Sequence, residues 1–278
     1  MRVYKTNKGI VLESEGSLYA SKQVSWDDFF KQNDLYQVLA SEISGAKSLG
    51  SAALLKEFHI LAPIQSQEIW AAGVTYTRSR DARMEESRDA GGGSFYDMVY
   101  DAIRPELFFK APAYRCVGPG DKVRIRRDST WNVPEPELTL AINSYGQIIG
   151  YTIGNDMSSR SIEGENPLYL PQAKSYDGSA ALGPCLLVLP LPISPDTKIQ
   201  MEIKRKQSVM YSDQIAINKM KRLHTELVEF LFRECSFPSG CFLMTGTCLV
   251  PPNDFTLQPG DETIIRIDEI GELYNEVA

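Results

Sequence analysis

Two glutamates separated by one residue stand at the beginning of an apolar stretch in the middle of the chain. Glu135 and Glu137 lie in the segment VPEPEL, and alternate residues of an extended chain point to the same face, so the two carboxylates lie side by side. Prolines on both sides of Glu135 keep the segment extended and out of a helix. A solvated strand edge is the ordinary interpretation of such a pair, but the apolar run Leu138–Ile142 that follows predicts the end of a buried strand.

A third acid, Asp156, closes the next apolar stretch, which ends in Gly-Asn-Asp. If the strands around Leu140 and Ile149 pair through the short turn between them, Asp156 returns beside Glu135 and Glu137. Two unit charges about 4 Å apart repel by roughly 4 kcal/mol at an effective dielectric near 20, so three close carboxylates require a proton or a cation among them. A ligand set made only of oxygens suits Mg²⁺, or else Mn²⁺ or Ca²⁺, and not zinc or copper.

Strands dominate the part of the chain that must position these acids. Apolar runs of strand length, several of them next to Pro-Gly-Asp turns, occur at 69–73, 122–126, 138–142, 148–153, 186–189, 199–204, 242–244 and 263–267. Two long helices are expected, at 79–100 and 221–235, and a shorter one is expected after Ser25. Many strands with few helices between them predict an α+β fold that is mostly β, and disfavour an all-parallel α/β fold. We expect a small N-terminal α+β domain at 1–65 and a main domain at 66–278.

The composition limits the function classes. The 278 residues include 29 Lys and Arg and 36 Asp and Glu, a net charge of −7, so the chain has no charge footprint for nucleic acid and no polybasic patch for an anionic membrane. No apolar run approaches the roughly 20 residues of a membrane-spanning helix, and the first residues lack the apolar core of a secretory signal. The five cysteines are odd in number and none is spaced as Cys-x-x-Cys, which predicts reduced thiols in a cytoplasmic protein.

Taken together, the motifs of the chain resemble those of the fumarylacetoacetate hydrolase superfamily. They are GVTY at 73–76, RPELFFKAP at 104–112, VPEPEL at 133–138, GYTIGNDMSSR at 150–160, KSYDG at 174–178, LGP at 182–184, MTGT at 244–247 and LQPGD at 257–261. No single motif is specific, but their order and spacing are.

The resemblance implies a mixed β-sandwich roll with a smaller N-terminal domain. It also implies that Glu135, Glu137 and Asp156 bind one divalent cation, usually Mg²⁺. Lys174 stands where the family has an active-site lysine, and Thr247 stands where a threonine contacts the carboxylate or keto group of the substrate. Members of the family are commonly oligomers, so we expect a homodimer or homotetramer acting on a small 2-oxo acid.

One departure from the family pattern affects the expected reaction. Hydrolytic members carry a histidine three residues after a motif tyrosine, but here Tyr76 is followed by Thr-Arg-Ser79. The two histidines, His59 and His224, lie far from this motif in sequence, and we interpret both as structural. The chain is most similar to the branch that dehydrates 2-keto-3-deoxy sugar acids, such as 2-keto-3-deoxy-arabinonate to the semialdehyde of 2-oxoglutarate, which requires no hydrolytic water.

The expected reaction assigns roles to two further groups. A 2-oxo acid would offer its carboxylate and keto oxygens to the cation, and an enolate would form when carbon 3 loses a proton. Lys174 is the candidate base, because burial beside a cation lowers the pKa of a lysine, and positioning of the substrate is the alternative. Glu106 is the candidate acid, with desolvation by Phe108 and Phe109 favouring its protonated form, and a turn-capping role is the alternative. Lys110 is interpreted as structural, in a surface pair.

The remaining candidates are substrate contacts. Arg160 is expected to orient Asp156 or to bind substrate oxygens through its planar guanidinium. Tyr76 and Ser79 are further candidates for substrate binding. The charged, glycine-containing segment 78–95 is interpreted as a lid that closes on substrate, with an exposed helix and loop as the alternative. Glu163 is assigned to a solvated loop, with contact to a substrate hydroxyl as the alternative.

The sequence leaves three functions open. The first is a divalent-metal-dependent dehydratase of a 2-keto-3-deoxy sugar acid. The second is a hydrolase that cleaves a C–C bond in an acylpyruvate or a similar β-diketo acid. The third is a catalytically silent protein that binds oxo acids.

Overall fold

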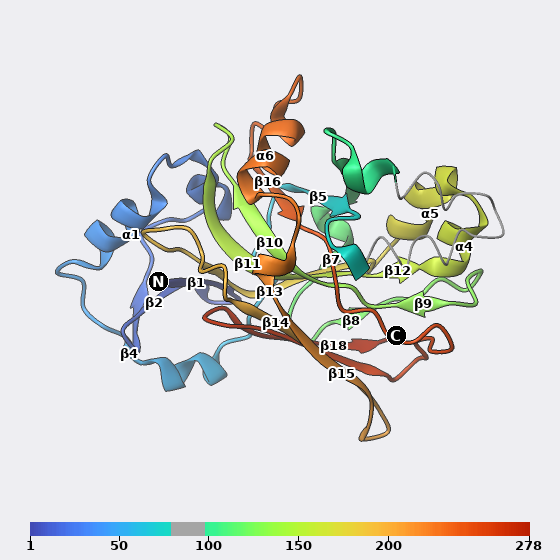
Figure 1. The fold of residues 1–278 in the computed structure, drawn as a ribbon. Helices are drawn as coiled ribbons and strands as arrows, with labels where there is room; N and C mark the ends of the chain where they lie inside the picture. The colour runs from blue at the N-terminus through green and yellow to red at the C-terminus, as the bar shows by residue number, and fades with distance from the viewer. Residues whose placement is uncertain (79–97) are drawn as a thin grey trace.

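The computed structural model describes residues 1–78 and 98–278, and a large mixed sheet forms its centre (Figure 1). The strands of this sheet are β1 (Arg2–Thr6), β2 (Gly9–Ser14), β3 (Ser17–Ala20), β4 (Gly50–Ser51), β5 (Glu68–Gly73), β6 (Glu106–Pro112), β7 (Cys116–Val117), β10 (Pro136–Ile142), β11 (Ile148–Asp156), β13 (Ala180–Leu187) and β16 (Cys241–Met244). Their order is β4-β3-β2-β1-β13-β11-β10-β16-β5-β6, with β7 paired to β13. The pairs β16–β5 and β13–β7 are parallel, and the others are antiparallel.

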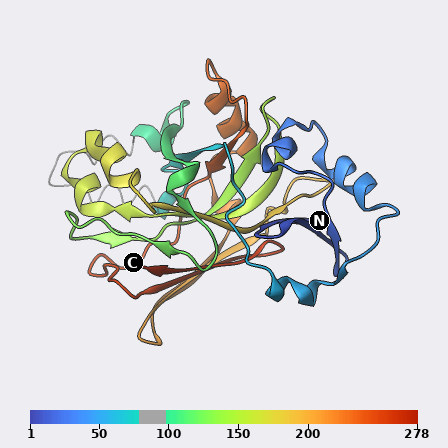
Figure 2. The ribbon, with the colours of Figure 1, turned by 180° about the vertical axis from the view of Figure 1, so that it is seen from behind.

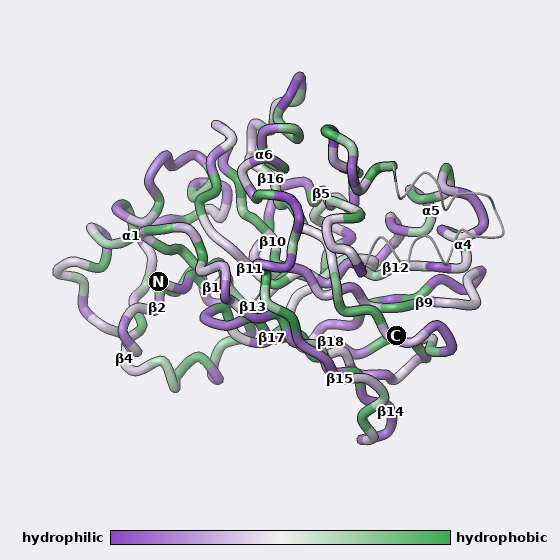
Figure 3. The backbone as a smooth tube through the Cα atoms, in the orientation of Figure 1, coloured by the Kyte–Doolittle hydropathy of each residue, from purple (hydrophilic) through white to green (hydrophobic). Residues whose placement is uncertain are grey.

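A second sheet packs against the first and encloses the main core. Its strands are β8 (Lys122–Val123), β14 (Lys198–Arg205), β15 (Ser208–Ala216), β17 (Glu262–Ile267) and β18 (Gly271–Val277), in the order β15-β14-β17-β18-β8. A separate two-stranded ribbon joins β9 (Asn132–Val133) to β12 (Ser158–Ser159). Apolar side chains from both sheets, such as Leu138, Ile153, Met201 and Ile265, form one buried cluster. Figure 3 shows apolar segments along these layers.

The helices that lie wholly within the described residues are short. They are η1 (Trp26–Lys31), α1 (Leu35–Ile43), η2 (Ala52–Glu57), η3 (Ala113–Arg115), α4 (Arg160–Glu165), η4 (Pro167–Tyr169), α5 (Leu170–Lys174), η5 (Ile217–Lys219) and α6 (His224–Phe232). The two views place the N-terminal helices and the α4–α5 pair at opposite ends of the molecule (Figures 1 and 2). No helix among the described residues has both the length and the apolarity that a membrane crossing requires.

Most predicted strands are confirmed, and the predicted helices are shorter than expected. The helix expected after Ser25 is split into η1 and α1, because Asp34 starts a new helix by accepting a hydrogen bond from the backbone N–H of Gln37 at 3.1 Å. The helix expected at 221–235 is α6, which begins at His224. The helix expected at 79–100 lies almost wholly outside the described residues.

The N-terminal segment is joined to the rest of the protein through the central sheet. β1 pairs antiparallel with β13, with Val3 opposite Leu186. The aromatic ring of Phe30 packs edge-on against that of Phe242 on β16, with 5.3 Å between the ring centroids. The N-terminal strands thus extend the main sheet, and a domain boundary near residue 65 stays a prediction.

Candidate metal centre and active site

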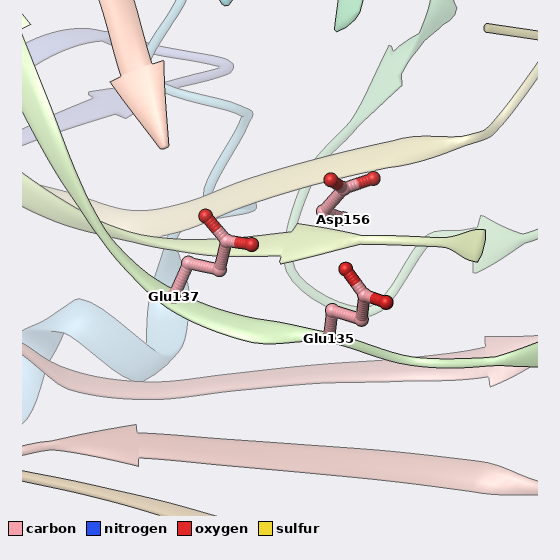
Figure 4. Close-up of side chains that lie close together, drawn as sticks. All are labelled: Glu135, Glu137 and Asp156. Atoms are coloured by element: carbon pink, nitrogen blue, oxygen red, sulfur yellow. The ribbon is translucent and has the colours of Figure 1, made fainter. Parts of the chain in front are cut away.

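The β10–β11 hairpin brings the three predicted acids together. The two strands pair antiparallel with Glu137 opposite Gly154, and the backbone N–H of Asp156 donates to the carbonyl of Glu135 at 2.9 Å. The hairpin expected from the sequence is therefore confirmed. Figure 4 shows Glu135 and Glu137 from one segment and Asp156 from the neighbouring strand, with their side chains close together.

The three carboxylates form a compact and buried oxygen set. One carboxylate oxygen of each residue lies within 4.8 Å of the others, and Glu135, Glu137 and Asp156 are 4%, 1% and 1% exposed. Oxygens around an octahedral Mg²⁺ at about 2.1 Å lie about 3 to 4.2 Å from one another. The spacing and the chemistry of these donors therefore fit a hard divalent cation.

Three positively charged side chains surround the same carboxylates. Lys174, at the end of α5, donates to Glu135 Oε2 at 2.6 Å and to Asp156 Oδ2 at 3.2 Å. Arg160, the first residue of α4, donates from Nη2 to Glu135 Oε1 at 3.2 Å. Both cations are buried, so they act on the carboxylates with little screening by water.

The third cation is Lys110 on β6, and the interpretation of this residue as part of a surface pair is wrong. Lys110 is 0% exposed, and its Nζ lies 2.6 Å from Asp156 Oδ1. Desolvation lowers the pKa of Lys110, while the negative charge of Asp156 acts in the opposite direction. The pattern of polar and apolar side chains along β6 does not predict that Lys110 is buried, because its partner Asp156 lies 46 residues further along the chain.

Glu137 has the most perturbed acid–base equilibrium of the triad. Burial raises the pKa of Glu137 well above its usual range, and the negative charges of Asp156 and Glu135 raise it further. Lys174 and the backbone N–H of Gly246, which donates to Glu137 Oε2 at 2.6 Å, act in the opposite direction. Without a metal ion, a proton on Glu137 relieves the repulsion within the triad.

Glu106 lies on the neighbouring strand and reaches over the backbone of Gly73. The two residues are opposite each other in the β5–β6 register, and a Cβ atom on Gly73 would lie only 1.9 Å from Glu106 Oε2. This oxygen is buried and has no hydrogen-bond partner among the described residues. Phe108 lines the site, whereas Phe109 packs against Trp70 at 5.9 Å between ring centroids. Desolvation of Glu106 by these two phenylalanines stays a prediction.

A small cavity of about 20 Å³ lies among the triad, Lys174, Arg160 and Thr247, with Gly73 in its wall. A cavity of this volume can hold one water molecule or an ion of similar size. Thr247 is 5% exposed, and its Oγ1 accepts a hydrogen bond from the backbone N–H of Leu249 at 3.3 Å.

Neither Tyr76 nor Ser79, the two further predicted substrate contacts, is among the described residues that line this cavity. Tyr76 is 1% exposed, and burial together with the charges of Cys248 and Glu137 raises its pKa. Ser79 and nearly all of the predicted lid at 78–95 lie outside the described residues. Arg78, at the start of that segment, donates to the carbonyl of Val250 at 3.1 Å.

Glu163 belongs to the buried surroundings of the site, and its assignment to a solvated loop is wrong. It lies on α4 and is 1% exposed. Its Oε2 accepts a hydrogen bond from the hydroxyl of Ser158 at 2.8 Å. The Gly and Glu residues around it resemble a loop in sequence, but the short helix α4 directs Glu163 inward.

The two histidines lie away from the carboxylates. His59 is exposed, and its backbone N–H donates to Asn7 Oδ1 at 3.2 Å. His224 begins α6 and lines a separate groove of about 800 Å³ between α1, α6 and the turn of the β10–β11 hairpin. Their placement agrees with structural roles.

Comparison with protein families gives a match over most of the chain. Residues 69–278 match the family model described as fumarylacetoacetate (FAA) hydrolase C-terminal. A protein of Haloferax volcanii, named probable 2-keto-3-deoxyxylonate dehydratase, is 48% identical over 221 residues, which are 79% of this chain and 75% of the relative. A protein of Saccharolobus solfataricus, named 2-dehydro-3-deoxy-D-arabinonate dehydratase, is 40% identical over 247 residues, which are 87% of this chain and 82% of the relative.

A solved structure also matches over the full length. It is described as 2-keto-3-deoxy-D-arabinonate dehydratase complexed with magnesium and 2,5-dioxopentanoate. Its TM-score to this chain is 0.82 at 32% sequence identity, and the match covers 100% of this chain and 98% of the other. The predicted fold class, a mostly β sandwich roll, is confirmed by this likeness.

Proposed function

The chain belongs to the fumarylacetoacetate hydrolase family, and from this membership and the geometry of the site we propose that it is a Mg²⁺-dependent dehydratase of a 2-keto-3-deoxy sugar acid. One arrangement carries the proposal. The buried triad of Glu135, Glu137 and Asp156 shares a single cavity with Lys174, which puts a hard-cation site beside a group that can exchange a proton. The Haloferax volcanii and Saccharolobus solfataricus relatives, 48% and 40% identical, are named as dehydratases of such acids.

The names of the relatives narrow the substrate class to five-carbon acids. In a 2-keto-3-deoxy pentonate, carbons 2 and 3 no longer carry stereocentres, so the D-arabinonate and D-xylonate derivatives are the same molecule. Loss of one water from this molecule gives 2,5-dioxopentanoate, the compound named with magnesium in the related structure. We infer that the substrate is a 2-keto-3-deoxy pentonate whose only stereocentre is carbon 4.

The residues of the site suggest how the elimination proceeds. A Mg²⁺ ion held by the triad would supply Lewis-acid stabilisation for the negative charge that develops when carbon 3 of a 2-oxo acid loses a proton. Lys174, as the neutral amine, accepts that proton. Glu106 donates a proton to the hydroxyl on carbon 4, which leaves as water and gives 5-hydroxy-2-oxopent-3-enoate. Transfer of a proton from carbon 5 to carbon 3 then gives the enol of the carbon-5 aldehyde, which tautomerises to 2,5-dioxopentanoate. The buried Oε2 of Glu106, without a partner among the described residues, is available for this donation.

The remaining candidate residues bind the substrate or hold the metal ligands in place. Arg160 holds Glu135 in place through its hydrogen bond of 3.2 Å, and its position on the cavity wall also puts it within reach of substrate oxygens. Thr247, on the same wall, binds the carboxylate or keto oxygen of the substrate. Tyr76 supports the pocket from beside Glu137, and substrate binding by Ser79 stays a prediction.

The two alternative functions gain no support from the site. A hydrolase needs a base that activates water, and neither His59 nor His224 lies near the triad. A silent binding protein has no need of the buried Lys174 beside the metal ligands, or of Glu106 with its buried Oε2 near them. Dehydration therefore remains the function that the geometry supports best.

The test is to incubate the protein with Mg²⁺ and each enantiomer of the 2-keto-3-deoxy pentonate, and to identify the products by mass spectrometry. We expect one enantiomer to be converted to a product lighter by one water. The conversion should stop in EDTA, return when Mg²⁺ is added back, and be lost in Lys174→Met. Two fragments that together contain one added water would instead establish hydrolysis, and binding without any product would establish the silent alternative.

Assembly and location complete the proposal. We propose a homodimer or homotetramer, as is common in the family, and a cytoplasmic location. All five cysteines are free thiols in the structure, as expected in a reducing compartment. Light scattering coupled to size-exclusion chromatography tests the assembly, and a single monomeric species at micromolar concentration would rule it out.

A further inference from the structure

We propose that Lys110 is a positioning residue, an internal counter-ion that holds Asp156 and the end of the helix carrying Lys174 in place before a metal ion arrives. This inference rests on the proposed function, because Asp156 is taken as a metal ligand and Lys174 as the base. It goes beyond that function by assigning a role to a residue outside the ligand set.

The hydrogen-bond partners of Lys110 define its role. Its Nζ contacts Asp156 Oδ1 at 2.6 Å and donates to the carbonyl of Met157 at 2.9 Å and to the carbonyl of Lys174. An ammonium has three hydrogens and no acceptor site; two of them go to these carbonyls, and the contact with Asp156 Oδ1 is an ion pair. The ring of Tyr176 adds a further contact, with its centroid 5.9 Å from Nζ.

These contacts connect three separate parts of the chain. Lys110 comes from β6, Asp156 is the last residue of β11 and Met157 follows it, and Lys174 closes α5. Both hydrogen-bond acceptors of Lys110 are backbone carbonyls, which cannot rotate away as side chains do. Lys110 is therefore fixed to the scaffold, and through it the carboxylate of Asp156 and the backbone of Lys174 share one anchor.

The charges explain why this anchor is needed in the absence of metal. The triad brings three carboxylates into a buried space, and Lys110, Lys174 and Arg160 bring three positive charges to the same place. Removing one partner of a buried ion pair leaves an uncompensated charge, which is strongly destabilising. A divalent cation bound to the triad would compensate the same negative charge, so the cost of losing Lys110 must depend on the metal.

The experiment measures thermal unfolding of wild type and Lys110→Met in EDTA and in saturating Mg²⁺. In EDTA we expect Lys110→Met to lower Tm by about 10 °C. In Mg²⁺ we expect less than half of that loss, so that Mg²⁺ raises Tm more in the variant than in wild type. An equal loss in both conditions would reduce Lys110 to a general packing role and overturn the proposal, as would no loss at all.

Matched controls separate this proposal from its premise. Lys122→Met removes a lysine that is 59% exposed and pairs with Glu276 at 2.7 Å, and it should behave as wild type in both conditions. Glu137→Gln removes a metal ligand and should abolish the response to Mg²⁺. If wild type itself shows no response to Mg²⁺ and no turnover, the proposed function fails. If wild type responds and Lys110→Met responds to the same extent, only the role of Lys110 fails.

A double variant keeps the test decisive if Lys110→Met does not fold in EDTA. Lys110→Met combined with Asp156→Asn removes both charges of the pair, and we expect it to fold in EDTA with a Tm closer to wild type than that of Lys110→Met. Failure of the double variant to fold would count against an electrostatic role for Lys110. At saturating Mg²⁺, kcat of Lys110→Met should fall at least about tenfold, because Lys174 has lost its anchor, and an unchanged kcat would contradict that part of the proposal.

Discussion

Charged side chains inside the protein are compensated residue by residue. The sequence-based argument that three close carboxylates require a proton or a bound cation considered only the acids. In the structure, Lys174 and Arg160 contact Glu135, and Lys110 contacts Asp156. The protein thus supplies much of the counter-charge itself, and the raised pKa of Glu137 shows where the remaining repulsion is relieved.

Glu137→Gln should separate metal binding from folding. Because burial and the negative charges of Asp156 and Glu135 already raise the pKa of Glu137, an uncharged side chain of the same shape relieves repulsion. We expect Tm in EDTA to be equal to wild type or higher by about 2 to 4 °C. Mg²⁺ should no longer raise Tm, and dehydration should fall by at least about 100-fold. Scanning fluorimetry measures Tm, and a coupled assay measures the rate of dehydration. A lower Tm in EDTA together with a retained Mg²⁺ response would contradict this role of Glu137.

Gly73→Ala tests whether the position of Glu106 matters for turnover. The added Cβ would meet Glu106 Oε2 at 1.9 Å and must displace the carboxylate. We expect kcat to fall by about 10- to 100-fold, with the Mg²⁺-induced rise in Tm unchanged. Glu106→Gln alone should lower kcat similarly, and the double variant should be no worse than Glu106→Gln. Additive losses in the double variant would show that Gly73 acts on the site by another route.

At the scale of elements, the β10–β11 hairpin determines the geometry of the site. Every residue of β10 is buried, so a shift of register would place Glu137 on the wrong face of the sheet. The register is supported on the far side by β16, where Met244 lies opposite Thr139. The precision of the metal centre therefore depends on the packing of three adjacent strands.

Gly154→Ala should disturb this packing. A Cβ on Gly154 would lie 2.3 Å from Thr139 Oγ1 and 3.0 Å from Met244 Cε, and overpacking of this kind costs about 1 to 3 kcal/mol. Thr139→Ala removes the closest obstructing atom, a buried hydroxyl without a partner among the described residues. We expect Thr139→Ala to recover at least half of the Tm lost in Gly154→Ala. A double variant that loses the sum of the two single losses would exclude steric conflict as the cause.

At the scale of the whole molecule, the free energy of unfolding should depend on pH through His224. Burial lowers the pKa of His224 to about 4, whereas an unfolded histidine has a pKa of about 6.5. Between these values the unfolded chain binds a proton that the native protein does not, so stability falls as the pH falls from 6.5 to 4. Because His224 is half-buried, water screens part of the effect, and we expect a loss of about 1 to 3 kcal/mol.

Urea unfolding at pH 4.5 and 7.5 measures this loss. His224→Gln should reduce the difference between the two pH values, and His59→Gln, at an exposed site, should leave it as in wild type. An equal pH dependence in wild type and His224→Gln would exclude this histidine as the source.

The sequence by itself determined the relations between residues that are close along the chain. The alternation of side chains in an extended segment placed Glu135 beside Glu137, and a short turn between two apolar runs returned Asp156 to them. The order of the motifs indicated the fold and the position of Lys174. Domain division, lid closure and the contact of Ser79 with substrate stay predictions.

Only the tertiary structure decided which distant groups share the site. Lys110 is 46 residues from Asp156 in the chain, and nothing in its local pattern distinguishes it from a surface lysine. Glu106 and Gly73 meet because two strands that are far apart in sequence pair in one register, and Glu163 is buried by the ribbon and helix around it. Such contacts depend on how sheets and helices pack together, and the periodicity of a single segment carries no information about the partner against which it packs.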